Sequence, residues 1–262
     1  MNVIEEVGKY HDYAVSMRRE FHKHPELSWK EVETAGRIRD ELAGMGIPYE
    51  EVAGTGPIAT LKGKEDQPVI GLRCDSDALP IREVKNLPYS SQNQGVMHAC
   101  GHDAHISMLL TAARVLAEHQ DELKCTVKLI FQPAEELTNG AVKVLESGKV
   151  GKLDTVAGMH IFPYLESGTI SVDPGPRYTS ASFMNTKIIG KSGHGAMPQY
   201  AVDPIYVGAR VLPAGRPAPW IRWWSASVPS IPVPWPMFLP RRLSSAVRCA
   251  PSIPSSRRNC RV

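Results

Sequence analysis

The first part of the chain carries apolar residues at helical spacing. In residues 3–22 they recur every three or four positions, which predicts a helix with one apolar face. His24 precedes a proline and predicts the end of this helix, because the residue before a proline disfavours helical backbone angles. The same spacing predicts a second helix from Glu31 to Met45.

Short apolar runs further along the chain predict strands between helices. The predicted strands are 58–61, 69–72, 126–131 and 155–161, and the predicted helices are 105–119 and 140–147. This alternation predicts an α/β domain with a mostly parallel sheet sandwiched by helices. A strand at 182–189 and a helix from Asp203 are predicted to follow.

The composition of the chain changes near residue 211. Residues 211–262 contain eight arginines but no lysine, aspartate or glutamate, and they hold ten of the 22 prolines and four of the five tryptophans. Three interpretations are open: a proline-rich linker or ligand for aromatic grooves, a basic membrane-surface segment, or a tail translated out of frame from about Val211. We favour the frameshift, because it explains the joint loss of lysines and acidic residues, and we expect a disordered tail.

Charge and cysteine content limit the classes of function. Residues 1–210 carry the other 22 basic and all 27 acidic residues, so their formal charge is −5, and the overall +3 is no sign of nucleic-acid binding. Five cysteines at irregular spacing argue against a disulfide framework, and we expect a cytoplasmic protein. The sequence shows neither a signal peptide nor a run of about 20 apolar residues, so no membrane partner is expected.

The densest chemistry lies in residues 97–105, which read Met-His-Ala-Cys-Gly-His-Asp-Ala-His. Thiol, imidazole and carboxylate groups are the ligands of zinc and its neighbours, and each is costly to bury unpaired. Cys100 and His102 converge only in a non-helical turn, which Gly101 permits. The alternative is a buried free cysteine beside surface histidines.

Two adjacent carboxylates, Glu135 and Glu136, follow the strong predicted strand at 126–131. Because catalytic groups of α/β sheets gather at the carboxyl ends of strands, one of them can hold a metal ion while the other acts as a base. The alternative is a solvated acidic loop. His160 lies near the end of the next predicted strand and projects to the same edge, although a lone histidine there is usually a core or rim residue.

Carboxylates also follow the strand at 69–72. Asp75 can orient a metal-binding histidine, whereas Asp77 fits a turn or helix cap at least equally well. Three strand ends and one helix start therefore deliver cysteine, histidine, glutamate or aspartate side chains. Together they predict a metal site at the edge of an α/β sheet.

Five motifs of the chain are similar to those of one enzyme family. They are Arg18–Glu26, Arg73–Ile81, Met97–His105, Gln132–Glu136 and Ser192–Pro198, and their order across residues 1–210 is that of the family. In these motifs the chain resembles the dinuclear metal-dependent amidohydrolases, a group that includes hippurate hydrolases, N-acyl-amino-acid amidohydrolases and indole-acetyl-amino-acid hydrolases.

The resemblance implies a catalytic domain over 1–180 and the start of an inserted α+β lid and dimerisation domain over 181–210. It implies two divalent ions (manganese, zinc, cobalt or nickel), an N-acyl amino acid as substrate, and a homodimer. The matching metal ligands are Cys100, His102, Glu136 and His160, the matching general base is Glu135, and His194 matches a lid histidine that stabilises the oxyanion. We group Asp75 with these catalytic residues as the one that orients a ligand.

The chain departs from the family on its C-terminal side. The family has one further metal-ligating histidine, whereas the last histidine here is His194, so we expect a truncated chain with a weakened metal site. The alternative function is an inactive remnant that retains partial metal binding. A third hypothesis is a cysteine hydrolase that uses Cys100 and a histidine.

Overall fold

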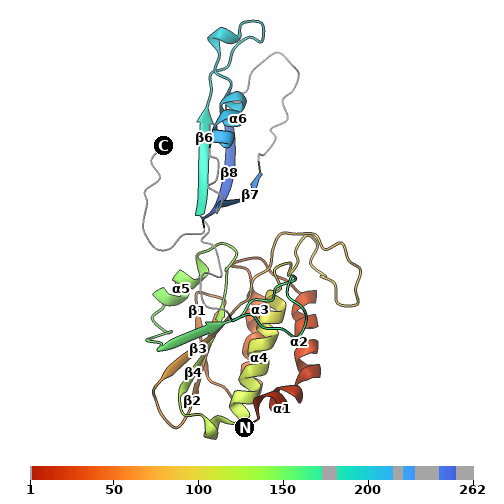
Figure 1. Ribbon diagram of the computed structural model, residues 1–262, viewed down its shortest axis with the longest axis vertical. Helices are drawn as coiled ribbons and strands as arrows, with labels where there is room; N and C mark the ends of the chain where they lie inside the picture. The colour runs from red at the N-terminus through yellow and green to blue at the C-terminus, as the bar shows by residue number, and fades with distance from the viewer. Residues whose placement is uncertain (1, 173–181, 215–220, 228–241, 252–262) are drawn as a thin grey trace. The chain divides into compact units, whose positions relative to one another are not determined.

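A computed structural model describes residues 2–172, 182–214, 221–227 and 242–251 of the chain (Figure 1). The chain forms two compact units, Met1–Thr169 and Ile170–Val262, and each is described by itself. The domain boundary expected after residue 180 lies outside the described residues. Among the described residues, the helices are all too short or too polar to cross a membrane.

The first unit consists of one sheet with helices against both of its faces (Figure 1). Its helices are α1 Val3–Gly8, α2 His11–Lys23, α3 Val32–Gly44, α4 His102–Glu118 and α5 Gly140–Glu146, with a 3-10 turn η1 at Gln120–Glu122. Its strands are β1 Tyr49–Val52, β2 Gly56–Lys62, β3 Val69–Asp75, β4 Thr126–Gln132 and β5 Thr155–Gly158. The α/β fold class expected from the sequence is confirmed.

The sheet is mixed, with the strand order β1-β2-β4-β3-β5. Its parallel part is β4, β3 and β5, whereas β1 and β2, and β2 and β4, pair antiparallel. In the parallel part Asp75 pairs with Gln132, and Arg73 pairs with Gly158. The carboxyl ends of β3, β4 and β5 therefore meet at one edge, which is where the sequence placed its candidate side chains.

Alternation along the strands divides the core into two layers. In β4, Leu129 and Phe131 are fully buried in the large cluster that includes residues of α2, α3 and α4. Ile130 between them points to the opposite face and packs with Val144 of α5. Because successive side chains of a strand point to opposite faces, a continuous apolar run fits a sheet that is covered on both sides.

The helix predicted over residues 3–22 is two helices, α1 and α2. Gly8 ends α1, and the amides of Lys9 and Tyr10 donate to carbonyls only three residues back, at Glu6 and Val7. The apolar spacing continues across this break, so periodicity alone did not reveal it. Strand β1 was also missed, because its residues are mostly exposed and the main-chain pairing with β2 holds it.

The second unit has its own sheet, in the order β6-β8-β7, with all pairs antiparallel. The strand predicted at 182–189 is β6 Ser182–Ile189, and the helix predicted from Asp203 is α6 Pro204–Ala214, preceded by a 3-10 turn η2 at Pro198–Tyr200. Two segments of the tail, which we expected to be disordered, form strands β7 Ile221–Ser227 and β8 Arg242–Pro251. These segments pair through the main chain because they contain no proline before residue 251; the rest of the tail beyond α6 lies outside the described residues.

Candidate metal centre

The turn that brings Cys100 and His102 together depends on Gly101, at the N-terminus of α4. Gly101 has a φ of 93°, in the left-handed region that side chains disfavour. A Cβ at this position would lie 2.3 Å from Ile161 Cδ1 and 2.7 Å from Ile161 Cγ1, so the next segment of the site packs directly on the glycine. The turn predicted from the Cys-Gly-His spacing is therefore present, and glycine is required for it.

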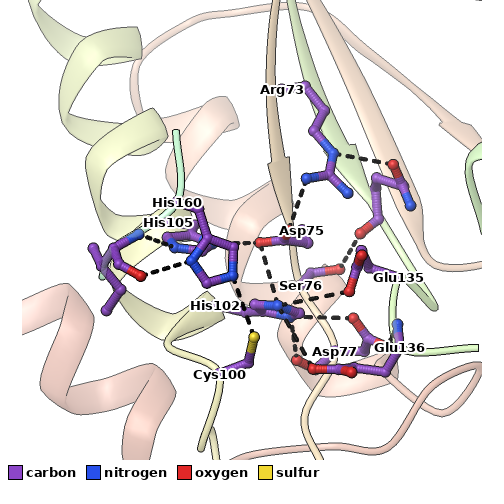
Figure 2. A network of polar contacts seen from close by, with 12 residues as sticks. Arg73, Asp75, Ser76, Asp77, Cys100, His102, His105, Glu135, Glu136 and His160 are labelled. Carbon is purple, nitrogen blue, oxygen red and sulfur yellow. Dashed lines mark hydrogen bonds and ion pairs between the residues drawn. The ribbon is translucent and has the colours of Figure 1, made fainter. Parts of the chain in front are cut away.

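His102 is fully buried at the centre of the site (Figure 2). Its Nδ1 lies 2.8 Å from the Asp77 carbonyl oxygen and 3.2 Å from the Asp77 carboxylate. With the Nδ1 proton directed at these acceptors, Nε2 is left with its lone pair, and this buried nitrogen has no hydrogen-bond partner. The second nitrogen of His102 is thus oriented as a ligand atom.

The charges around His102 favour a cation. Burial by itself lowers the pKa of His102, but its neighbours Asp77, Cys100 and Asp75 raise this pKa to about 11. Burial also disfavours the charged form of Glu136, and it therefore raises the pKa of this carboxyl group. The same neighbouring groups that raise the pKa of His102 would also stabilise a divalent ion at its Nε2.

Glu135 and Glu136 differ in how far their side chains are exposed to solvent. Glu135 Oε2 and Glu136 Oε1 are each 3.9 Å from His102 Nε2, but the Glu135 side chain is 40% exposed and that of Glu136 only 19%. Glu136 Oε1 is buried with no hydrogen-bond partner. The two adjacent carboxylates therefore have the different environments that a ligand and a base need.

Cys100 and His160 close the other side of the site. Cys100 Sγ lies 3.3 Å from His160 Nε2, while His160 Nδ1 lies 2.6 Å from the carbonyl oxygen of Ile161. His160 follows the end of β5 by two residues, so it reaches the sheet edge from the expected strand. Burial raises the pKa of the Cys100 thiol, which a metal ion would reverse by binding the thiolate.

The donor atoms form three overlapping groups, in each of which they lie within 4.8 Å of one another. The groups are Cys100, His102 and His160; His102, Glu135 and Glu136; and Asp75, His102 and His105. Thiolate, imidazole and carboxylate donors suit zinc, manganese, cobalt and nickel. The buried, unpartnered His102 Nε2 and Glu136 Oε1 show that these residues fit a metal ion.

Two residues near the site were not assigned a role there by sequence reasoning. Asp77, for which a turn or cap was at least equally favoured, contacts His102 and also accepts hydrogen bonds from Ser28 Oγ at 2.6 Å and from the Glu136 amide at 3.0 Å. Glu31 is fully buried and accepts from the Ala134 amide at 2.8 Å, next to the two glutamates. Asp77 could have been recognised from the sequence by its position two residues after Asp75. The sequence around Glu31 contains no comparable signal.

Asp75, for which we predict a role in orienting a ligand histidine, lies beside two histidines of α4. Its Oδ1 lies 2.5 Å from His105 Nδ1 and 3.7 Å from His102 Nε2. Burial opposes ionisation of Asp75, yet the hydrogen bond to His105 and the neighbouring positive charges hold its pKa below the usual range. The Nδ1 atom of His102 is contacted by Asp77.

His194 lies in the second unit, Ile170–Val262. It is exposed, and its Nδ1 accepts a hydrogen bond from the amide of Ala196 at 3.1 Å. Since a backbone amide can only donate, the ring proton of neutral His194 is on Nε2. His194 thus presents a hydrogen-bond donor at the tip of its ring.

Known proteins are similar to this chain in sequence, and solved structures are similar to it in fold. The chain is 45% identical over 205 residues to an N-acetylcysteine deacetylase of Bacillus subtilis, a match that covers 78% of this chain and 54% of the relative. It is 43% identical to the IAA-amino acid hydrolase ILR1-like 4 of Arabidopsis thaliana, covering 78% of this chain and 46% of the relative. The chain thus spans about half the length of these curated relatives.

A solved structure extends the similarity. The Bacillus subtilis YXEP protein, described as a dinuclear metal-binding peptidase from the M20 family, superimposes with a TM-score of 0.70 and 37% identity over 93% of this chain and 65% of its own. The family model for peptidase family M20/M25/M40 matches residues 71–245, which include Cys100, His102, both glutamates and His160 and reach into the arginine-rich tail. On these grounds the chain belongs to peptidase family M20/M25/M40, a family of metal-dependent hydrolases.

Proposed function

We propose that this chain carries the metal site of an amidohydrolase that cleaves the amide bond of N-acyl amino acids. The observation that carries the proposal is the glutamate pair: both carboxylates lie 3.9 Å from His102 Nε2, with Glu136 largely buried and Glu135 accessible. The relatives named as an N-acetylcysteine deacetylase and an IAA-amino acid hydrolase support the substrate class.

Four residues of the site would hold the metal ions. They are Cys100, His102, Glu136 and His160. A bound divalent ion supplies Lewis acidity, which lowers the pKa of a water molecule and polarises an amide carbonyl. The donor types suit manganese, zinc, cobalt and nickel, and competition between these ions under dialysis identifies the preferred one.

The geometry supports a proposed role for each of three residues in the reaction. Glu135, the accessible carboxylate, takes a proton from the attacking water and returns it to the leaving amine. Asp77 keeps the proton of His102 on Nδ1, so that Nε2 remains a ligand. His194 has its ring proton on Nε2 and is proposed to donate it to the oxyanion that forms on the carbonyl.

A matched pair of variants tests the roles of the glutamates. Glu135→Gln should bind the same number of metal ions as the wild type and lose hydrolysis of N-acetyl amino acids by roughly 10²–10⁴-fold. Glu136→Gln should lose metal affinity, because it replaces a carboxylate that faces His102. Metal content after dialysis and product release by chromatography measure the two effects. Full turnover by Glu135→Gln would refute the assignment.

A second candidate function is metal binding without turnover. All three donor groups share His102, whose Nδ1 is engaged by Asp77, so only one nitrogen of this residue is available to one ion. This sharing favours a single tightly held ion. One bound ion per chain and no hydrolysis of any N-acyl amino acid would support this candidate, whereas two ions and hydrolysis would support the enzyme.

The family resemblance also leads us to propose a homodimer formed through the second unit. Analytical ultracentrifugation of the full chain measures this directly. A monomer at all concentrations would contradict the dimer and leave the metal site of the first unit unaffected.

A further inference from the structure

His105 lies within the site, but both of its ring nitrogens are already engaged by protein groups. Its Nδ1 lies 2.5 Å from Asp75 Oδ1, and its Nε2 accepts a hydrogen bond from the amide of Ile161 at 3.0 Å. Because a backbone amide can only donate, Nε2 carries no proton, and the ring proton is on Nδ1, directed at Asp75. The lone pair that could bind a metal is therefore occupied by the Ile161 amide.

The amide that His105 holds belongs to the peptide bond between His160 and Ile161. The carbonyl oxygen of Ile161 lies 2.6 Å from His160 Nδ1, which leaves His160 Nε2 directed at Cys100 Sγ. The rings of His105 and His160 also meet edge to face, with centroids 4.7 Å apart and an angle of 69° between their planes. His105 thus fixes both the backbone and the ring of His160.

The pair of Asp75 and His105 is itself anchored in the sheet. The other carboxylate oxygen of Asp75 accepts from Arg73 Nη1 at 2.7 Å, and Arg73 Nε donates to Gln132 Oε1 at 3.0 Å (Figure 2). Asp75 and His105 are each only 2% exposed. These contacts connect β3, β4 and α4 to the exposed segment after β5.

We propose that Asp75 and His105 are a positioning pair that sets the place of His160 in the metal site, and that His105 is not a metal ligand. The donor atoms of Asp75, His102 and His105 lie close enough to form a metal-ligand group, so composition and proximity alone would assign His105 as a ligand. The hydrogen bond from the Ile161 amide assigns it the other role. The inference rests on the proposed function in that His160 must bind metal for its position to matter.

Imidazole nitrogen NMR of the full chain tests the tautomer directly. With ¹⁵N-histidine in the metal-free protein, His105 should show a protonated Nδ1 and an unprotonated Nε2. On addition of zinc, the Nε2 resonances of His102 and His160 should shift strongly, and that of His105 should stay near its metal-free value. A His105 nitrogen that shifts like the other two would overturn the inference.

Variants separate positioning from ligation through metal affinity. His105→Asn keeps a donor for Asp75 but has no acceptor at the Ile161 amide, whereas His105→Gln places an amide oxygen further out, where it can accept. We expect His105→Asn to weaken zinc binding by about 10- to 100-fold with unchanged stoichiometry, and His105→Gln to recover part of the loss. Ser107→Ala, which removes a partly buried hydrogen bond from the same helix to the Ala14 carbonyl, is the control and should leave zinc affinity unchanged.

The outcomes distinguish this inference from the proposed function. If the wild type binds no zinc, the proposed function fails, and the tautomer in the metal-free protein still decides whether His105 holds the Ile161 amide. If the wild type binds zinc and His105→Asn lowers the stoichiometry, His105 is a ligand and the inference fails. If Asp75→Asn and His105→Asn weaken zinc binding equally and their double variant no further, the two residues act as one unit, as proposed. Additive losses would contradict that coupling.

Discussion

Replacing Gly101 with alanine should lower both the stability of the first unit and its affinity for metal, and a control variant separates the two effects. Two effects oppose the alanine: its backbone at a φ of 93°, and the contact of its Cβ with the Ile161 side chain at 2.3 Å and 2.7 Å. Ile161 cannot retreat as a whole, because its amide donates to His105. Its Cδ1 is, however, the end of a flexible side chain on a residue that is 38% exposed, so part of the overlap can be relieved by rotation.

The magnitude follows from these two effects. A left-handed backbone costs an alanine about 1–2 kcal/mol, and an overpacked contact that is partly relieved adds about 1 kcal/mol. We therefore expect Gly101→Ala to lower the free energy of unfolding of the first unit by about 2–3 kcal/mol. Metal affinity should fall as well, because the alanine displaces the turn that carries Cys100 and His102.

Gly148→Ala is the matched control, since Gly148 has a φ of 70° with open space around the position of a Cβ. This control carries only the backbone effect of about 1–2 kcal/mol and should leave metal affinity unchanged. Urea unfolding followed by circular dichroism measures the stabilities, and zinc competition with a chromophoric chelator measures the affinities. Adding Ile161→Ala to Gly101→Ala should recover the steric part. Equal losses from the two glycine variants, or no recovery with Ile161→Ala, would refute the reasoning.

Four further results are expected. Asp77→Asn should weaken zinc binding by about 10- to 100-fold, and Ser28→Ala, which removes only one of the hydrogen bonds to Asp77, should weaken it less, as measured by chelator competition. Removing a metal held at a hundred times its dissociation constant should lower the free energy of unfolding by about 2.7 kcal/mol in urea titrations with and without chelator. The hydrogen bond to Asp103 raises the pKa of His22, so its stabilisation is present below the unfolded pKa and is lost as pH rises through the folded value; the stability difference between wild type and His22→Gln should shrink over that range. Leu129→Ala, at a fully buried core position, should cost about 2–5 kcal/mol in the same assay.

Most of the fold could be predicted because its elements are encoded locally. The run at 126–131 is apolar on both faces and became β4, since α-helices cover both sides of it. The antiparallel pairing of β2 with β4 was not predictable, because strand direction depends on the connection between strands and on partners far along the chain. The same holds for β1, whose exposed side chains carry no periodic signal.

The metal centre could be predicted only in part, for a related reason. The positions of Glu135, Glu136 and His160 followed from a single rule, that parallel strands end at a common edge. The roles of Asp75 and Asp77 did not, because both residues lie at the end of β3 and are distinguished mainly by partners far away in the sequence. Asp77 contacts His102 and accepts from Ser28, 49 residues before it, whereas Asp75 contacts His105 and Arg73.

We propose that a ligand is distinguished from a supporting residue in this site by a buried atom that has no hydrogen-bond partner in the protein. His102 and His105 lie one helical turn apart, are both buried, and have ring centroids 5.4 Å apart. Neither the sequence nor the proximity of the two rings therefore tells which histidine binds a metal ion. Both nitrogens of His105 are satisfied within the protein, but His102 Nε2 is buried and unpaired, as is Glu136 Oε1 opposite it. Leaving buried polar atoms unpaired costs about 1–3 kcal/mol each, and a cation between these two atoms would remove that cost for both. The same reasoning makes His105 part of the scaffold, since withdrawing its Nε2 to bind metal would leave the Ile161 amide unpaired.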